Sequence, residues 1–193
     1  MTTVDDIEGA QRAIEGWLTE VVVGLNLCPF ARPVLTDDTL RLVVSRARNK
    51  EALLEEVRDE LRLLVNTPET EISTSLIGSP WTLEEFLDFN DFCGAVEDTI
   101  HQMKLEGMVQ LATFHPHYRF HGEESESLSN YTNRSPVPLL HLLRDADITD
   151  AVNAHPDTLS IPTRNIATLA GLNTDSLEAL RHACRPFEPS NDQ

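Results

Sequence analysis

The chain has 193 residues, a net charge of -17 and 40% apolar side chains, which indicates one globular domain with a buried core. The negative charge argues against binding to nucleic acid or to an anionic membrane, because both require a basic surface. No apolar run approaches the ~18 residues of a membrane span, and acidic residues stand near the N-terminus, where a signal peptide carries positive charge, so we expect a cytoplasmic protein.

Helical and strand patterns alternate in the first part of the chain. Apolar residues at spacings of three and four predict helices, and short alternating or continuous apolar runs predict strands. Thr82 and Glu85 form a capping-box pattern, which predicts the start of a helix. In chain order we predict a helix at 3–25, a strand at 39–44, a helix at 51–66, a strand at 72–78, a helix from 82 to 107 and a strand at 108–114.

The second part of the chain begins with a polar segment. Residues 121–135 contain several glutamates and are predicted to form a solvated loop. Pro138 suits the first turn of a helix, because its fixed φ matches the helical value. Two further short helices are predicted at 163–170 and 174–183, and the tail at 186–193 is predicted to be frayed.

The order strand, helix, strand, helix, strand favours right-handed crossovers and a sheet that is at least partly parallel. We therefore predict a single α/β domain with a small sheet of about three core strands flanked by helices. The near-continuous apolar run from Met108 to Phe114 predicts a central strand buried on both faces. Ligands of such sheets gather beyond the carboxyl ends of the strands, so the segments that begin at Ser45, Ser79 and His115 are expected to converge on one edge.

The segment from Asn133 to Arg144 is dense in side chains that hold anions or protons. On the predicted helix, His141 and Arg144 stand three residues apart and share one face. An arginine fork beside the N–H groups of a helix start makes an anion pocket, which predicts a substrate site of Asn133, Arg134, Ser135 and Arg144. The alternative is that Asn133 and Arg134 only cap and tie down a long loop.

The three cysteines, Cys28, Cys93 and Cys184, are too few and too scattered for a disulfide framework or a cysteine-based zinc site. Cys93 falls in the apolar stripe of a helix and is predicted to be a core residue. Cys28 follows a helix and stands near an arginine and two prolines, which favours partial exposure and a thiolate. The thiolate would attack an electrophilic carbon while His115 or His141 moves the proton; otherwise Cys28 is a small buried hydrophobe.

His115 and His117 stand two residues apart at a strand end, so both rings point to one side if the strand continues. With His121, His141 or Glu123 they could form a three-ligand metal site with one open position. The proline between the first two histidines disturbs the strand period, and no spacing rule marks the third ligand. We therefore predict no metal site and keep a His-ligated metal enzyme as an alternative.

Three segments resemble the signature of a bacterial family of unknown function. They are residues 25–31, 114–118 and 132–144, which read LNLCPFA, FHPHY and TNRSPVPLLHLLR. The resemblance extends from the first helix to about Leu172, and the family pattern varies at the position of His117. The resemblance implies no reaction, but it implies which positions are functionally important. These positions are Cys28, His115, Asn133, Arg134, Ser135, His141 and Arg144.

A shorter resemblance is local to Cys28-Pro29-Phe30-Ala31. This tetrapeptide is similar to the active-site tetrapeptide of some thioredoxin-like thiol transferases. In those proteins the cysteine follows a strand and opens a helix, which lowers its pKa. Here the tetrapeptide follows a predicted helix, and Pro33 breaks the residues after it.

These observations lead to the hypothesis of a cytoplasmic enzyme that acts on a small anionic metabolite. The competing hypothesis is a non-catalytic module that binds a ligand or a protein partner through the same pocket. The sequence predicts no particular cofactor, reaction or oligomeric state. In the enzyme hypothesis the catalytic residues are Cys28, His115 and His141, and the substrate-binding residues are Asn133, Arg134, Ser135 and Arg144.

Overall fold

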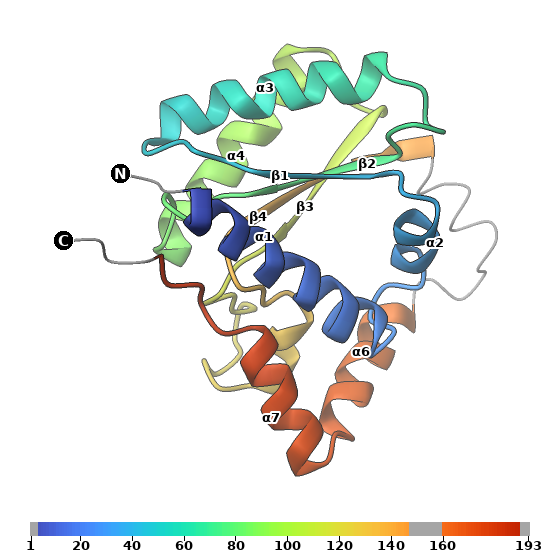
Figure 1. The fold of residues 1–193 in the computed structure, drawn as a ribbon, viewed down its shortest axis with the longest axis vertical. Helices are drawn as coiled ribbons and strands as arrows, with labels where there is room; N and C mark the ends of the chain where they lie inside the picture. Colours follow the sequence, from blue (N-terminus) through green and yellow to red (C-terminus); the bar gives the residue numbers. More distant parts are fainter. Residues whose placement is uncertain (1–3, 147–159, 190–193) are drawn as a thin grey trace.

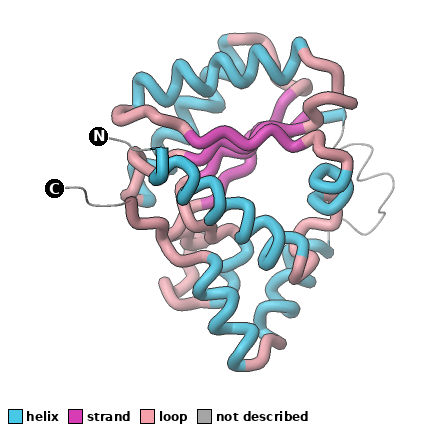
Figure 2. Tube along the Cα trace, in the orientation of Figure 1, coloured by secondary structure: helices cyan, strands magenta, loops and turns pink. Residues whose placement is uncertain are grey.

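A computed structural model describes residues 4–146 and 160–189. It shows a four-stranded sheet between two helical layers (Figures 1 and 2), which confirms the predicted α/β class. No helix in the described part is long and apolar enough to cross a membrane. The strands are β1 (Leu40–Val44), β2 (Thr74–Gly78), β3 (Val109–Phe114) and β4 (Leu139–Arg144). The helices are α1 (Val4–Trp17), the π-helix η1 (Leu18–Val23), α2 (Ala31–Thr36), α3 (Lys50–Asn66), α4 (Phe86–Gln102), the 3-10 helix η2 (Leu128–Thr132), α6 (Ile161–Ala170) and α7 (Thr174–Ala183).

The sheet has the strand order β1-β2-β4-β3. β1 and β2 are parallel, as predicted, and β4 runs antiparallel to both β2 and β3. The predicted central position of β3 is wrong, because β4 lies between it and β2 and leaves β3 at one edge. β1, β2 and β3 therefore run in the same direction, with their carboxyl ends at one side of the sheet.

The helix predicted from Pro138 is wrong, and its residues form the central strand β4. Both faces of this strand are covered, so four of its six residues are leucines, and a doubly buried strand cannot be told from a buried helix by periodicity. The change of structure separates two predicted site residues. His141 and Arg144 are three residues apart, so in a strand they point to opposite faces.

Helices α1 with η1, α3, α4, α6 and α7 follow the predictions to within a few residues, whereas the short helices α2 and η2 were not predicted. Two further details differ from the predictions. The Thr82 capping box does not form, because α4 begins only at Phe86 and the hydroxyl of Thr82 lies against that of Ser79 instead. The tail is not frayed at Phe187, whose N–H donates to the carbonyl oxygen of Pro136 at 2.8 Å and whose ring packs on the core. Residues 190–193 of the predicted tail lie outside the described residues.

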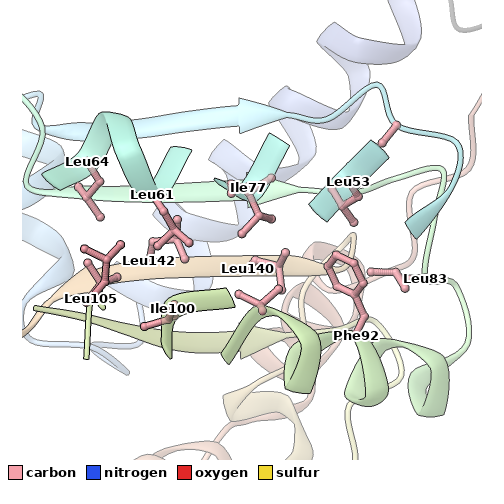
Figure 3. Close-up of a cluster of buried hydrophobic side chains, with 14 of the residues drawn as sticks. Leu53, Leu61, Leu64, Ile77, Leu83, Phe92, Ile100, Leu105, Leu140 and Leu142 are labelled. Atoms are coloured by element: carbon pink, nitrogen blue, oxygen red, sulfur yellow. The ribbon is translucent and has the colours of Figure 1, made fainter. Parts of the chain in front are cut away.

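The two faces of the sheet bury separate apolar clusters. One face is covered by α3 and α4, and Figure 3 shows leucines of α3 and β4 meeting around Ile77 of β2. The other face is covered by α1 and η1, with α7 packed behind them. Helix α1 packs tightly on the sheet at Gly78, where a Cβ atom would lie 2.7 Å from the side chain of Ile14.

The predicted convergence of three loops at the carboxyl edge of the sheet is confirmed. The N–H of Ser45, after β1, donates to the carbonyl oxygen of Gly78 at 2.8 Å. The His115 ring, after β3, bonds to the carbonyl oxygen of Leu83 at 2.9 Å. The guanidinium of Arg48 lies 5.0 Å from the ring centroid of Trp81.

Candidate functional site

A cavity of about 260 Å³ lies on the α1 face of the sheet. All four strands contribute to its floor, and its other walls come from α1, η1, α2 and the linker before α2. The floor contains two rows of paired strand residues, Leu76–His141–Ala112 and Thr74–Leu143. Cys28 lies in the same lining, so the structure brings together two of the predicted catalytic residues, Cys28 and His141.

The cavity lining is almost wholly apolar. The rings of Trp17 and Phe114 meet edge to face with their centroids 5.1 Å apart, and the centroids of Phe114 and His141 are 6.5 Å apart. Besides Cys28 and His141, the described lining residues that carry a polar side-chain atom are Trp17, Ser73 and Thr74, and the indole nitrogen of Trp17 is enclosed. No Arg, Lys, Asp or Glu occurs among the described lining residues.

The turn before Cys28 is set by the π-helix η1. Its end is closed by Gly24, whose N–H donates to the carbonyl oxygen of Thr19 at 3.0 Å. A Cβ atom at Gly24 would overlap the carbonyl oxygen of Glu20, so this turn requires glycine. From α6, the side-chain amide of Asn165 donates to the carbonyl oxygen of Leu27 at 2.7 Å, which holds the linker beside the cavity.

The Cys28 thiol is protonated at neutral pH. Burial raises its pKa above the ordinary value of 9.0, and the backbone N–H groups of Phe30 and Ala31 oppose this effect without cancelling it. Cys93 and Cys184 are also desolvated, and burial raises the pKa of each to about 12. Cys28 differs from them because it lines the cavity.

The His141 imidazole is neutral, because burial lowers its pKa to about 4. Its Nε2 atom lies 2.7 Å from the hydroxyl oxygen of Thr74. The Thr74 hydroxyl is also 2.7 Å from the carbonyl oxygen of Leu142, to which it donates. One ring nitrogen of His141 is thus occupied, and no hydrogen bond to Nδ1 occurs among the described residues.

His115 does not line the cavity. It is fully buried, between Phe86 and Phe89 of α4. Its Nδ1 accepts from the N–H of His117 at 3.0 Å, so Nε2 carries the hydrogen and donates to Leu83. Desolvation lowers its pKa to about 4. Both ring nitrogens are bonded to backbone groups, one in the loop that carries His115 and one in the loop between β2 and α4.

Asn133, Arg134 and Ser135 tie down the loop, as in the alternative that the sequence left open. The side-chain amide of Asn133 donates to a β3 carbonyl at 3.2 Å, and the hydroxyl of Ser135 donates to the carbonyl of Val137 at 2.6 Å. The Arg134 guanidinium lies 4.5 Å above the ring of Tyr131 and donates to two loop carbonyls. None of these three side chains lines the cavity.

Arg144 lies at the other end of the sheet from Arg134. Its guanidinium donates to the carbonyl oxygens of Leu64, Thr67 and Ile72, with Nη2 to oxygen distances of 2.7 Å to Thr67 and 3.0 Å to Ile72. These groups belong to the C-terminal turn of α3 and the loop that follows. The predicted anion pocket that joins Asn133, Arg134 and Ser135 to Arg144 is therefore not assembled.

The histidines considered as metal ligands are also separated. His117 and His121 are exposed at the surface, whereas His115 is enclosed by the loop and α4. Within residues 4–146 and 160–189, no group of three or more His, Cys, Asp or Glu side chains is arranged to hold a metal ion. Among the described residues, the titratable groups of the cavity lining are the thiol of Cys28 and the imidazole of His141.

A family model described as a protein of unknown function, DUF1415, matches residues 9–179. The chain belongs to this family. The matched range includes the three segments that resembled a family signature, at 25–31, 114–118 and 132–144. No match was found among curated proteins or among solved structures.

Two residues of the site in this DUF1415 chain were not predicted from the sequence. Thr74 holds His141 from the neighbouring strand, and Ala112 leaves space in the floor of the cavity. Both lie on the α1 face because they alternate with residues that face α3 and α4. The alternation of side chains along these two strands can be read from the sequence. It indicates a cavity only when β4 is known to lie between β2 and β3.

The raised pKa of Cys28 leads to a pH prediction. We expect the rate at which N-ethylmaleimide alkylates Cys28 to rise about tenfold per pH unit from pH 6 to 8.5, because the thiolate fraction rises tenfold per pH unit below the pKa. Peptide mass mapping measures this rate for each cysteine. Cys93 and Cys184 should react more slowly at every pH. A rate at Cys28 that levels off near pH 7 would mean a lowered pKa and would contradict this assignment.

Proposed function

We propose that this protein binds a small, uncharged and predominantly apolar molecule in the cavity between the sheet and α1, η1 and α2. The observation that carries the proposal is the lining: aromatic and aliphatic side chains surround a space of about 260 Å³, with Cys28 and His141 as its titratable groups among the described residues. Ligand pockets in proteins are commonly apolar with a few placed polar groups.

The charges around the cavity support an uncharged ligand over the anionic metabolite suggested by the sequence. Both arginines assigned to the anion make hydrogen bonds elsewhere, and an ion without a partner in an apolar lining loses its hydration. A smaller adjoining hollow shares four lining residues with the cavity, and its own lining includes the carboxylates of Glu15 and Asp38; the shared residues are Leu18, Val34, Leu35 and Leu40. Carboxylates beside the cavity, in a chain of net charge -17, repel anions.

Two dyes with the same aromatic body test this proposal. N-phenyl-1-naphthylamine is uncharged, and 8-anilino-1-naphthalenesulfonate adds one sulfonate to it. We expect saturable one-to-one binding of the uncharged dye, seen as an increase in fluorescence, and at least tenfold weaker binding of the sulfonate, because burying an unpaired ion costs several kcal/mol. Equal or tighter binding of the sulfonate, or no binding of either dye, would overturn the proposal.

A second candidate function is a thiol-dependent reaction on the bound molecule. It is favoured by the presence of Cys28 and His141 in one lining. The buried thiol would need a base, and the neutral imidazole has a nitrogen free to accept its proton. In His141→Phe, alkylation of Cys28 at pH 7 should then slow by at least tenfold, whereas an unchanged rate would leave ligand binding alone as the function.

A further inference from the structure

The hydrogen bonds of Thr74 determine which nitrogen of His141 carries the hydrogen. The Thr74 hydroxyl has one hydrogen, and a carbonyl oxygen can only accept. The 2.7 Å distance from Thr74 Oγ1 to the carbonyl oxygen of Leu142 therefore places that hydrogen between these two atoms. The bond of 2.7 Å between Thr74 Oγ1 and His141 Nε2 must then use a hydrogen on Nε2.

The same reasoning leaves the other nitrogen of His141 as a lone-pair acceptor. Nδ1 has no hydrogen-bond partner in the described part of the chain, and it is not among the fully enclosed polar atoms that lack a partner. His141 lines the cavity, with Leu76 and Ala112 beside it on the neighbouring strands. An acceptor in such apolar surroundings loses its bond to water and gains most from a donor on a ligand.

The two buried histidines differ in this respect. His115 is held in the same tautomer, with its hydrogen on Nε2, but its Nδ1 accepts from the backbone N–H of His117. His141 has the equivalent nitrogen unoccupied. The other polar groups of the described lining are the Cys28 thiol, the enclosed indole N–H of Trp17 and the hydroxyls of Ser73 and Thr74. No hydrogen bond joins Cys28 to His141 in the structure.

We infer that His141 Nδ1 is the polar anchor of the cavity, fixed as an acceptor by Thr74, and that it selects ligands with an uncharged hydroxyl or N–H donor on an apolar body. Alcohols, phenols, indoles and amides have such a donor. Ethers, ketones and ionised carboxylates have only hydrogen-bond acceptors, so they cannot bond to the lone pair of Nδ1. The inference rests on the proposed binding function and specifies the ligand class and the residue that recognises it.

A matched ligand pair tests the anchor. 2-Naphthol and 2-methoxynaphthalene share one ring system, and only the naphthol donates a hydrogen bond. We expect the wild type to bind 2-naphthol about tenfold more tightly, the effect of one hydrogen bond in an apolar site. In Thr74→Val the preference for 2-naphthol should fall below threefold, whereas Thr74→Ser, which keeps the hydroxyl, should retain it. The control is Thr99→Val, which removes a buried hydroxyl that bonds only within α4. This variant should show the same preference as the wild type.

A second measurement reads the tautomer without any ligand. A two-bond proton–nitrogen correlation spectrum at pH 7 should show His141 protonated at Nε2 in the wild type and in Thr74→Ser, with a loss of this preference in Thr74→Val. Equal affinities for the two naphthalene compounds, or a hydrogen on Nδ1 in the wild type, would overturn the anchor while leaving the binding function intact. If neither these compounds nor the uncharged dye binds, the binding function itself is wrong.

Discussion

Replacing Arg144 with alanine is expected to lower the free energy of unfolding by about 3 kcal/mol, measured by urea denaturation. The guanidinium bonds three carbonyl oxygens at and after the end of α3, and a helix C-terminus has carbonyls that lack partners in the helix. Removing a charged donor from partly buried acceptors costs a few kcal/mol. Binding of the uncharged dye should be unchanged, because Arg144 lies outside the cavity lining.

Two variants control this prediction. Arg144→Lys should recover only part of the loss, because an ammonium keeps the charge but cannot bond several carbonyls through a planar fork. Arg12→Ala should change the free energy of unfolding by less than about 0.5 kcal/mol, because Arg12 forms one exposed ion pair within α1. A stable Arg144→Ala protein that has lost ligand binding would restore the substrate-binding role predicted from the sequence.

Replacing Ala112 with leucine is expected to raise the free energy of unfolding by about 1–2 kcal/mol, because the added carbons fill empty apolar space without displacing neighbours. The matched control is Ala10→Leu in α1, where the same atoms enter a fully buried site away from the cavity. Overpacking there should lower the free energy of unfolding by about 1–3 kcal/mol. Opposite signs for the two variants would show that the cavity is empty space in the folded protein, whereas losses of similar size would show that it is filled.

Much of the fold could be predicted because its signals are local. Helices α3 and α4 have an apolar face that repeats at the helical spacing, and every second residue of β1, at Leu40, Leu42 and Val44, packs on the core cluster of the α1 face. Asn49 and Asn173 stand at the starts of α3 and α7, where their side chains accept backbone N–H bonds at 2.8 and 2.9 Å, as residues favoured at helix starts commonly do. Even the convergence of the three loops followed from strand direction alone.

The position of β4 could not be predicted from the sequence. The predicted anion site was therefore wrong, because it assumed a helix where β4 forms. Leu140 and Leu142 face α3 and α4, while Leu139, His141 and Leu143 face the other side, so every position is covered and no polar face marks a strand. Its pairing with β2 joins residues more than 60 positions apart in the sequence. A single sequence contains no local signal for such a contact.

The residues of the candidate site were predicted only in part, because their chemistry is visible in the sequence but their position in the fold is not. Cys28 and His141 were both selected because of their chemistry, and they line one cavity although they are far apart in the sequence. His115, Arg134 and Arg144 were selected by the same criterion, but their polar groups are occupied by backbone partners. A polar residue in a sequence does not reveal whether its partner is a ligand or a nearby carbonyl, and only the fold separates the two.

The most direct measurement is a fluorescence titration of N-phenyl-1-naphthylamine into the wild type, Ala112→Leu and Ala10→Leu, with thermal unfolding used to verify that each protein is folded. If the ligand occupies the cavity, Ala112→Leu weakens binding by at least tenfold because the added side chain takes the ligand's space, while Ala10→Leu binds as the wild type does. Equal dissociation constants in all three folded proteins would place the bound dye elsewhere and would contradict the cavity as the functional site.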